Sequence, residues 1–360
     1  MTVAPLSLRQ RSLRMALALA LGLVGATLFM YLRLPLPWLL GSMCICTILA
    51  LLKAPLLPPL RARPAMIAVL AVMLGSRFAP DFIDRASDWL LSLSLLSAYI
   101  AIVAAVTIPY LQRVAGYDRV TAYFSAMPGG LNEMVIVGGA MGGDERKISL
   151  VHATRILLVV FIVPFWFQLV NGIQIGDRSS FGVSFTETPP LDFLLLGLCI
   201  AIGWRIAKAV RLPAPQFFGP LLLSAALHLS GFSEAEPPSE LVNLAQLVIG
   251  VTVGARFVGT ATRDVLRSIG FGIVNTSMIL GICGAFAYSL HKVTDVNVAA
   301  MILAYAPGGM PEMSLIALAM GLDVAFVVTH HAMRAAVIFI GTPLVFRLLE
   351  RRRQRLADAG

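Results

Sequence analysis

Two short blocks of the 360-residue sequence place a glutamate three positions after a Pro-Gly-Gly triplet, inside an apolar stretch. Proline removes a backbone donor and glycine admits unusual backbone angles, so each triplet is expected to break a helix. In membrane transporters such breaks bind substrate or coupling ion, and intramembrane carboxylates usually mark an ion or substrate path. The candidate binding residues are Pro128, Gly129, Gly130 and Glu133 in the first block and Pro307, Gly308, Gly309 and Glu312 in the second.

A histidine and an arginine three residues apart follow each block, as His152 with Arg155 and His331 with Arg334. Residues at this spacing share a helix face. The apolar run after each arginine covers about twelve residues, roughly 18 Å of helix, which is too short to cross a core of ~30 Å. The helix must therefore begin before the arginine. We expect both arginines to lie within the hydrocarbon as substrate- or ion-binding residues, and both histidines to be candidate proton relays.

The same residues also admit a structural interpretation. Each glutamate could pair with its arginine, because buried charges are normally paired, and each histidine could be a neutral hydrogen-bond partner. The blocks are not equivalent, since Asn132 of the first is matched by Pro311 of the second. A polar amide in one block suggests asymmetric ligand contacts, so Asn132 joins the candidate site. Asp144 and Asp323 are expected to cap the helices that follow them.

The composition requires an environment of lipid around these residues. Hydrophobic residues make up 58% of the chain and charged residues 13%, and the mean hydropathy is +0.85. A soluble enzyme or DNA-binding protein needs about a quarter of its residues charged. The formal charge of +9 comes mostly from arginines scattered between apolar segments. This pattern indicates membrane topology and argues against direct nucleic-acid binding.

The sequence gives little support to catalysis. Cys44, Cys46, Cys199 and Cys283 all lie in apolar stretches and have no metal-ligand spacing with the histidines. No phosphate loop, HExxH pattern or Ser-His-Asp spacing is present. We therefore expect no enzyme activity, no metal site and no cofactor.

The positioning elements are twelve apolar stretches, six in each half of the chain. Sequence blocks of the first half return in the second at an offset of 178 or 179 positions, which indicates a duplication. Arg33 to Gly41 returns as Arg211 to Gly219, and Arg77 returns as Arg256. The expected stretches are 15–32, 36–52, 64–79, 89–111, 119–141, 148–170, 190–207, 212–230, 240–257, 266–290, 296–320 and 325–349.

The basic residues distinguish two topologies, given a cytoplasmic amino terminus. Six crossings in each half would place Lys208, Arg211, Arg256, Arg263 and Arg267 outside, against the positive-inside bias. If each Pro-Gly-Gly stretch instead enters and leaves on one side, each half has five crossings and the halves are inverted, which makes those residues cytoplasmic. We favour the inverted arrangement, although Arg33, Arg77, Arg85, Arg178 and Lys292 do not follow the rule.

The expected fold is therefore an all-α integral membrane protein of two inverted repeats, each of about five transmembrane helices and one Pro-Gly-Gly re-entrant or broken helix. The first membrane repeat covers residues 1–171, an extramembrane linker 172–189, the second repeat 190–350 and a basic cytoplasmic tail 351–360. We expect a multi-pass protein of the bacterial inner (plasma) membrane with both termini in the cytoplasm. Its partners would be the lipid bilayer and a small-molecule or ion substrate, and a homo-oligomer stays open.

The paired blocks around Pro128 and Pro307 make the sequence resemble the bacterial membrane AbrB family, whose members carry a duplicated membrane domain. The resemblance covers nearly the whole chain. It implies the labels that family members carry, which are regulator of gene expression and ammonia monooxygenase, and it supplies no functional residues. The layout is also similar to that of secondary carriers such as the 2-hydroxycarboxylate symporters, by analogy of fold alone.

Our leading hypothesis is a secondary transporter of a small solute, anionic or an amino acid, coupled to a proton or sodium ion. In this hypothesis the glycine amides and arginines attract the solute and a glutamate carries the coupling ion. The alternative from another class is a membrane-embedded regulator that affects gene expression. An ammonia monooxygenase ranks third.

Overall fold

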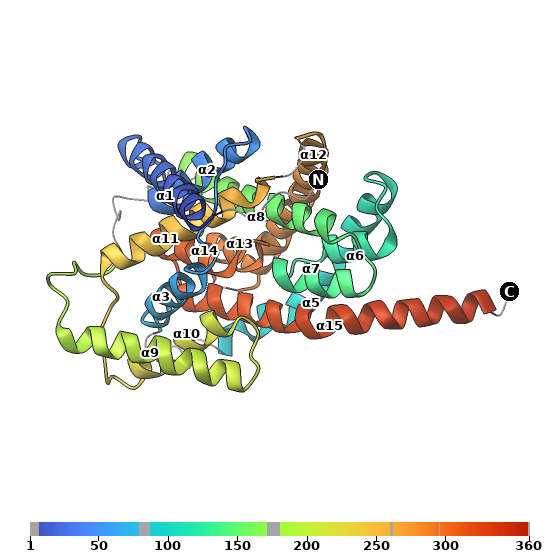
Figure 1. The fold of residues 1–360 in the computed structure, drawn as a ribbon. Helices are drawn as coiled ribbons and strands as arrows, with labels where there is room; N and C mark the ends of the chain where they lie inside the picture. Colours follow the sequence, from blue (N-terminus) through green and yellow to red (C-terminus); the bar gives the residue numbers. More distant parts are fainter. Residues whose placement is uncertain (1–6, 79–86, 171–180, 260–261, 295, 359–360) are drawn as a thin grey trace. The chain divides into compact units, whose positions relative to one another are not determined.

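A computed structural model describes residues 7–78, 87–170, 181–259, 262–294 and 296–358, and its regular structure within these ranges is entirely helical (Figure 1). Within these ranges, seven helices are long and apolar enough to cross a membrane. The expected all-helical, multi-pass membrane class is therefore confirmed. Residues 172–180 of the expected linker, together with Arg85 and Arg178, lie outside the described residues.

Every apolar stretch expected from the sequence contains helix, and the two Pro-Gly-Gly stretches each contain two short helices. The first half comprises α1 (Leu8–Tyr31), η1 (Pro37–Gly41), α2 (Ser42–Leu51), α3 (Arg63–Gly75), η2 (Ser87–Trp89), α5 (Leu90–Arg113), α6 (Arg119–Ala126), α7 (Leu131–Ala140) and α8 (Glu145–Val170). The second comprises α9 (Pro190–Ala209), α10 (Pro215–Leu229), α11 (Ser239–Gly254), η3 (Ala255–Phe257), α12 (Thr262–His291), α13 (Val298–Tyr305), α14 (Met310–Ala319) and α15 (Val324–Asp358). Residues 351–358 of the expected tail continue α15.

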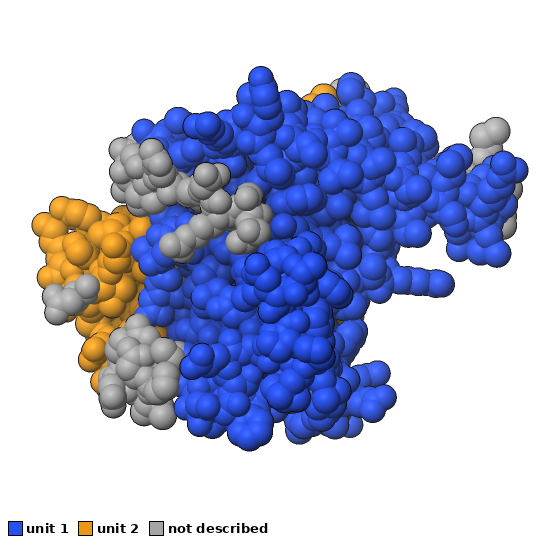
Figure 2. All heavy atoms as spheres, turned by 90° about the vertical axis from the view of Figure 1, so that its left-hand side faces the viewer, with its two compact units in different colours: residues 1–83, 161–262, 314–325 blue, residues 84–160, 263–313, 326–360 orange. Residues whose placement is uncertain are grey.

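The chain divides into two compact units, and each unit takes segments from both halves of the sequence (Figure 2). Unit 1 consists of Met1–Ile83, Phe161–Thr262 and Ser314–Ala325. Unit 2 consists of Asp84–Val160, Arg263–Met313 and Phe326–Gly360. Both Pro-Gly-Gly breaks, both glutamates and both His-Arg pairs belong to unit 2. All candidate site residues therefore lie in the same unit.

In unit 1 a helix of each half of the sequence packs on a helix of the other half. Gly75 at the end of α3 packs so closely on α10 that a Cβ there would lie 2.6 Å from the Leu221 carbonyl oxygen. The counterpart Gly254 of α11 packs in the same way on α2, 2.5 Å from the Met43 carbonyl oxygen. Each of these contacts has its partner in the other copy. The reciprocity is what a two-fold relation between duplicated halves produces.

A second duplicated contact joins neighbouring helices of unit 1 through glycine alone. A Cβ on Gly25 of α1 would lie 2.2 Å from the Gly41 carbonyl oxygen, and a Cβ on Gly203 of α9 would lie 2.5 Å from that of Gly219. Both glycine pairs are 178 positions apart in the sequence (25 and 203, 41 and 219). Small residues that let helix backbones touch are a common packing device in membranes.

Replacing Gly203 by alanine should therefore lower the thermal stability of the protein. The added methyl would meet backbone, which cannot rotate away, and we expect a loss of about 1–3 kcal/mol. Gly197 lies on the same helix and has open space around its Cβ position, so Gly197→Ala should be neutral or stabilising by up to ~1 kcal/mol. Thermal unfolding of both variants in detergent tests this contact, and equal melting temperatures would contradict it.

Candidate functional site

The Pro-Gly-Gly triplets interrupt two helical segments of unit 2, as the sequence predicts. Between α6 and α7 the backbone is extended at Met127 (φ −62°, ψ 129°) and again at Gly130 (φ −64°, ψ 136°). Between α13 and α14 it is extended at Ala306 (φ −56°, ψ 134°). The last carbonyls of α6 and α13 cannot bond within their helices and require other donors.

The predicted arginines donate to carbonyls of the breaks themselves, just beyond the ends of these helices. Arg155 of α8 donates to the carbonyl oxygens of Met127 at 2.8 Å and Gly129 at 2.9 Å. Arg334 of α15 donates to the carbonyl oxygens of Ala306 at 2.7 Å and Gly308 at 3.5 Å. The two sets are related by 179 positions (127 and 306, 129 and 308, 155 and 334). We call each set of Arg–carbonyl bonds a clamp.

Each clamp includes its histidine in the same geometry. Nε2 of His152 lies 2.9 Å from the Phe124 carbonyl oxygen, and its Nδ1 lies 3.0 Å from an Arg155 nitrogen. Nε2 of His331 lies 2.9 Å from the Leu303 carbonyl oxygen, and its Nδ1 lies 2.7 Å from Arg334. A carbonyl only accepts and a guanidinium only donates, so the proton belongs on Nε2 and Nδ1 accepts.

The histidine contacts therefore match the expectation of a neutral hydrogen-bond partner that orients the arginine. The proton-relay role stays a prediction. Both His-Arg pairs have the i,i+3 spacing that brings them to one helix face. His152 and Arg155 are 0% and 1% exposed, and His331 and Arg334 are 1% and 5% exposed.

The arginines bind backbone carbonyls, whereas the structural interpretation of the sequence paired them with glutamates. Among the described residues, neither guanidinium has a carboxylate within ion-pair distance. The positive charge of each arginine instead lies at the carboxyl end of a short helix, where the helix dipole is negative. A Cβ on Gly129, whose carbonyl belongs to the first clamp, would lie 2.7 Å from Cγ2 of Ile338, which follows Arg334 of the second clamp by one turn of α15. The two clamps are therefore close together in unit 2.

The glutamates occupy the opposite ends of the breaks. Glu133 and Glu312 are each the third residue of the helix that follows, and their carboxylates lie over the second glycine of the triplet. A Cβ on Gly130 would be 2.1 Å from Glu133 Oε2, and a Cβ on Gly309 would be 1.9 Å from Glu312 Oε2. This position places negative charge at a helix amino terminus. Glu312 is buried and Glu133 is half-buried, while Asn132 is exposed.

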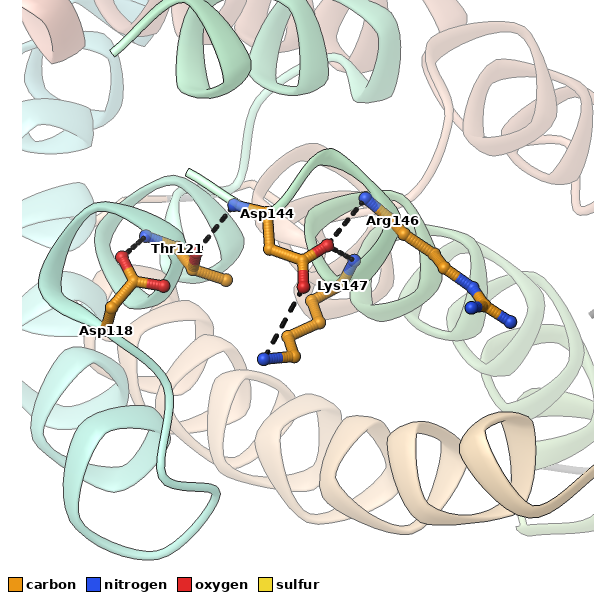
Figure 3. Close-up of polar contacts among 5 residues, drawn as sticks. All are labelled: Asp118, Thr121, Asp144, Arg146 and Lys147. Atoms are coloured by element: carbon orange, nitrogen blue, oxygen red, sulfur yellow. Dashed lines mark hydrogen bonds and ion pairs between the residues drawn. The ribbon is translucent and has the colours of Figure 1, made fainter. Parts of the chain in front are cut away.

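Figure 3 shows how the two ends of the first broken segment are joined. The Asp144 backbone N–H donates to Thr121 Oγ1 at 2.8 Å, so the residues after α7 lie beside the start of α6. Asp144 accepts from the backbone N–H groups of Arg146 and Lys147, both at 3.1 Å. The expectation that Asp144 caps α8 is confirmed.

Sequence reasoning missed the cap of α6, although the duplication could have revealed it. Asp118 accepts from the Thr121 backbone N–H at 2.9 Å. Its counterpart Asn297, 179 positions later, accepts from the Ala299 backbone N–H at 2.8 Å and caps α13. Burial acts to raise the pKa of Asp118, but hydrogen bonds from Thr121 outweigh it and hold that pKa below its usual value. The cap's contribution to stability is thus present above the ordinary aspartate pKa and is lost as the pH falls through the lowered one.

Removing the Asp144 side chain should destabilise this junction. Asp144→Ala takes away the acceptor for two backbone N–H groups, and we expect the free energy of unfolding to fall by about 0.5–2 kcal/mol. Asp144→Asn keeps a capping oxygen and should retain most of the stability. Thermal unfolding of both variants at neutral pH measures the difference. Equal losses would show that charge, rather than capping, is responsible.

The comparisons with known proteins identify the family of this chain. The model of the family described as "Transition state regulatory protein AbrB" matches residues 38–350. The chain belongs to the AbrB family. It is 24% identical to the Bacillus subtilis (strain 168) protein named "Uncharacterized protein YhjN", over 92% of each chain. It is also 24% identical to the Escherichia coli (strain K12) protein named "Putative regulator AbrB", over 89% of this chain and 92% of that one.

Family membership confirms the resemblance drawn from the Pro-Gly-Gly blocks, which lie inside the matched region. The names of the AbrB relatives give no substrate. Within the described ranges no three histidine, cysteine, aspartate or glutamate side chains gather in a group that could hold a metal ion.

Proposed function

We propose that this AbrB-family protein is a secondary transporter of a small solute, coupled to a proton or a sodium ion. The observation that carries the proposal is the pair of matched helix breaks, each with an arginine clamp at one side and a glutamate at the other. Unwound backbone at membrane depth occurs only where it is buried in protein or lines a wet cavity, and in transporters it holds substrate and ion.

In this proposal both broken segments are re-entrant hairpins. The hydrogen bond between Asp144 and Thr121 supports the first one, because it brings the end of α7 back to the start of α6 (Figure 3). A broken but complete crossing would hold those ends about 30 Å apart on opposite surfaces of the bilayer. The duplication extends the same interpretation to α13 and α14.

The proposed repeats are inverted in the membrane. We call the end of a hairpin where its two helices enter and leave the membrane its mouth. Four basic residues lie close in sequence to the first mouth, namely Arg113, Arg119, Arg146 and Lys147, whereas Lys292 is the basic residue close to the second. The positive-inside bias then assigns the first mouth to the cytoplasm and the second to the outside. Arg77, which does not follow the bias, forms an ion pair with Glu236 at 2.8 Å. The proposed location is the bacterial inner membrane, with both termini in the cytoplasm.

Reconstitution into liposomes tests the transport proposal. The protein should move a labelled solute against its gradient when a proton or sodium gradient is imposed, and ionophores that collapse the gradient should stop the uptake. A screen of small anions and amino acids in which no solute accumulates under either gradient would contradict the proposal.

The printed names of the relatives favour one second candidate, a membrane-embedded regulator. Its test is co-purification of a cytoplasmic partner that is lost when residues 351–360 are removed, combined with no flux of any solute. The exposed Arg351, Arg352 and Arg355 at the end of α15 would provide the contact. A monooxygenase ranks third, and metal analysis of the purified protein tests it.

A further inference from the structure

The first clamp lies beside a group of fully buried polar side chains on three helices. Ser125 of α6, Asn275 and Thr276 of α12 are 0% exposed, and Thr154 of α8 is 1% exposed. None of these side chains has a hydrogen-bond partner for its polar atoms among the described residues. Nε of Arg155, the next residue after Thr154, is also buried without a hydrogen-bond partner. We call Ser125, Thr154, Asn275 and Thr276 the polar layer.

The packing of α6, α8 and α12 brings these side chains to one depth. The three helices begin at the same side, where Asp144 bonds Thr121 and the Tyr117 ring packs on Phe271. One apolar cluster then joins Ala122 and Ala126 of α6, Val151 of α8 and Phe271 of α12. Ser125, Thr154 and Asn275 follow Ala122, Val151 and Phe271 by three or four residues, which is about one turn on each helix.

Direct contact between α8 and α12 supports this placement. A Cβ on Gly272 would lie 2.6 to 3.5 Å from the side-chain atoms of Thr154. Asn275 and Thr276 follow Gly272 by three and four residues, so they continue the same face of α12. The glycine lets α12 approach Thr154 closely, and the next turn of that face carries the amide and the hydroxyl.

The charge of the surroundings selects an anion. Arg155 and Arg334 are buried and lack a carboxylate at ion-pair distance among the described residues. Buried charges are normally paired, and a buried polar group without a partner costs about 1–3 kcal/mol. Three of the five Arg155 N–H donors are taken by Met127, Gly129 and His152, which leaves one Nη1–H and the Nε–H, and Nε has no partner. Arg155 Nε, the hydroxyls of the polar layer and the Asn275 amide together provide hydrogen-bond donors for an anion.

The duplication does not repeat the polar layer, although it repeats the clamp. Positions 179 residues away hold Ala304 in place of Ser125 and Met333 in place of Thr154, while Asn275 corresponds to Leu96. Thr276 corresponds to Ser97, which is exposed and not buried. A structural requirement of the clamp would have been met in both copies. Within the described ranges, the second clamp therefore has no buried counterpart of this polar layer.

We propose that the polar layer and Arg155 Nε bind a small carboxylate anion, whose oxygens accept hydrogen bonds from Ser125, Thr154 and Asn275. The inference deepens the proposed transport function, and rests on it in taking the bound carboxylate as the solute that moves. Binding itself is a separate property, so it can be measured without flux.

Thermal unfolding of the purified full-length protein tests this site, with acetate, lactate or succinate added as the sodium salt and sodium chloride at equal ionic strength as the reference. At least one carboxylate should raise the melting temperature saturably, since a ligand that binds only the folded state stabilises it. Thr154→Val and Asn275→Leu should weaken the apparent Kd about 10-fold or more, as expected for the loss of roughly 1.4 kcal/mol. If Thr154→Val or Asn275→Leu fails to fold, Ser125→Ala provides a third variant with a smaller change in side-chain volume.

Met333→Leu is the matched control, because Met333 is the counterpart of Thr154 in the second copy. It should respond to carboxylate as the wild type does. Without ligand, Thr154→Val should melt at or above the wild-type temperature, since the lost hydroxyl has no partner. The inference is overturned if no carboxylate acts beyond chloride, or if the polar-layer variants respond as the wild type does. Carboxylate binding without flux would instead overturn the transport proposal alone.

Discussion

Glu312→Gln should abolish coupled transport in liposomes while leaving the protein folded. Glutamine keeps the size and the hydrogen-bonding oxygen of the side chain over Gly309, but it cannot bind a proton or balance a sodium ion. We expect the initial rate to fall about 100-fold, equivalent to roughly 2.7 kcal/mol. Glu133→Gln should reduce the rate less, because Glu133 is half-buried whereas Glu312 is buried.

Glu145→Gln is the matched control, because Glu145 is an exposed acid in the first turn of α8. It should transport at the wild-type rate. Melting temperatures of all three variants separate loss of function from loss of fold. Undiminished coupled flux in both Glu133→Gln and Glu312→Gln would remove the carboxylates from the mechanism.

Arg155→Lys should reduce both transport and stability even though it keeps the positive charge. The planar guanidinium donates to Met127, Gly129 and His152 at once, whereas an ammonium is a compact point charge that cannot span those acceptors. Each buried carbonyl left without its donor costs about 1–3 kcal/mol. We expect a clear fall in melting temperature and an approximately 100-fold loss of flux, the equivalent of roughly 2.7 kcal/mol.

Arg113→Lys is the matched control for Arg155→Lys, because Arg113 belongs to the same unit but is exposed. It should behave as the wild type in both measurements. Arg334→Lys should resemble Arg155→Lys in stability, since the duplicated clamp makes the same bonds. If Arg155→Lys matched the wild type in stability and flux, a charge alone would suffice and the clamp would have no role.

The helix breaks and the placement of the glutamates could be read from the sequence. Pro128 and Pro307 cannot continue a helix, and a glutamate three residues after the second glycine must fall in the first turn of the helix that restarts. The His-Arg spacing correctly predicted a shared face, and Asp144 correctly predicted a cap. The offset of 178 or 179 positions indicated the duplication, and the structure shows contacts that recur at the same offset, such as Gly25 with Gly41 and Gly203 with Gly219.

The partners of the arginines could not be predicted in this way. Residue types suggest ion pairs, so the sequence pointed to Glu133 and Glu312, but the acceptors are carbonyl oxygens that every residue carries. Only the conformation of the break reveals which carbonyls lack a helical donor. The polar layer escaped notice for a related reason, because one serine or asparagine in an apolar helix does not indicate which neighbouring helix it faces.

The compact units also lie beyond simple sequence reasoning. A duplication suggests one domain for each repeat, whereas unit 1 and unit 2 each combine segments of both halves. The reciprocal packing of α3 on α10 and α11 on α2 explains this outcome for unit 1. Glycine contacts such as Gly75 with Leu221 join residues far apart in the chain, and no local pattern encodes such pairings.

The orientation of the two hairpins is the central claim, and labelling of single cysteines from either side of the membrane tests it most directly. In a background without the four native cysteines, Arg146→Cys marks the mouth of the first hairpin and Asn297→Cys the mouth of the second. Both positions are exposed. The account predicts that an impermeant thiol reagent reaches Asn297→Cys only from outside and Arg146→Cys only from the cytoplasmic side. Reaction of both cysteines from the same side would contradict the inverted arrangement.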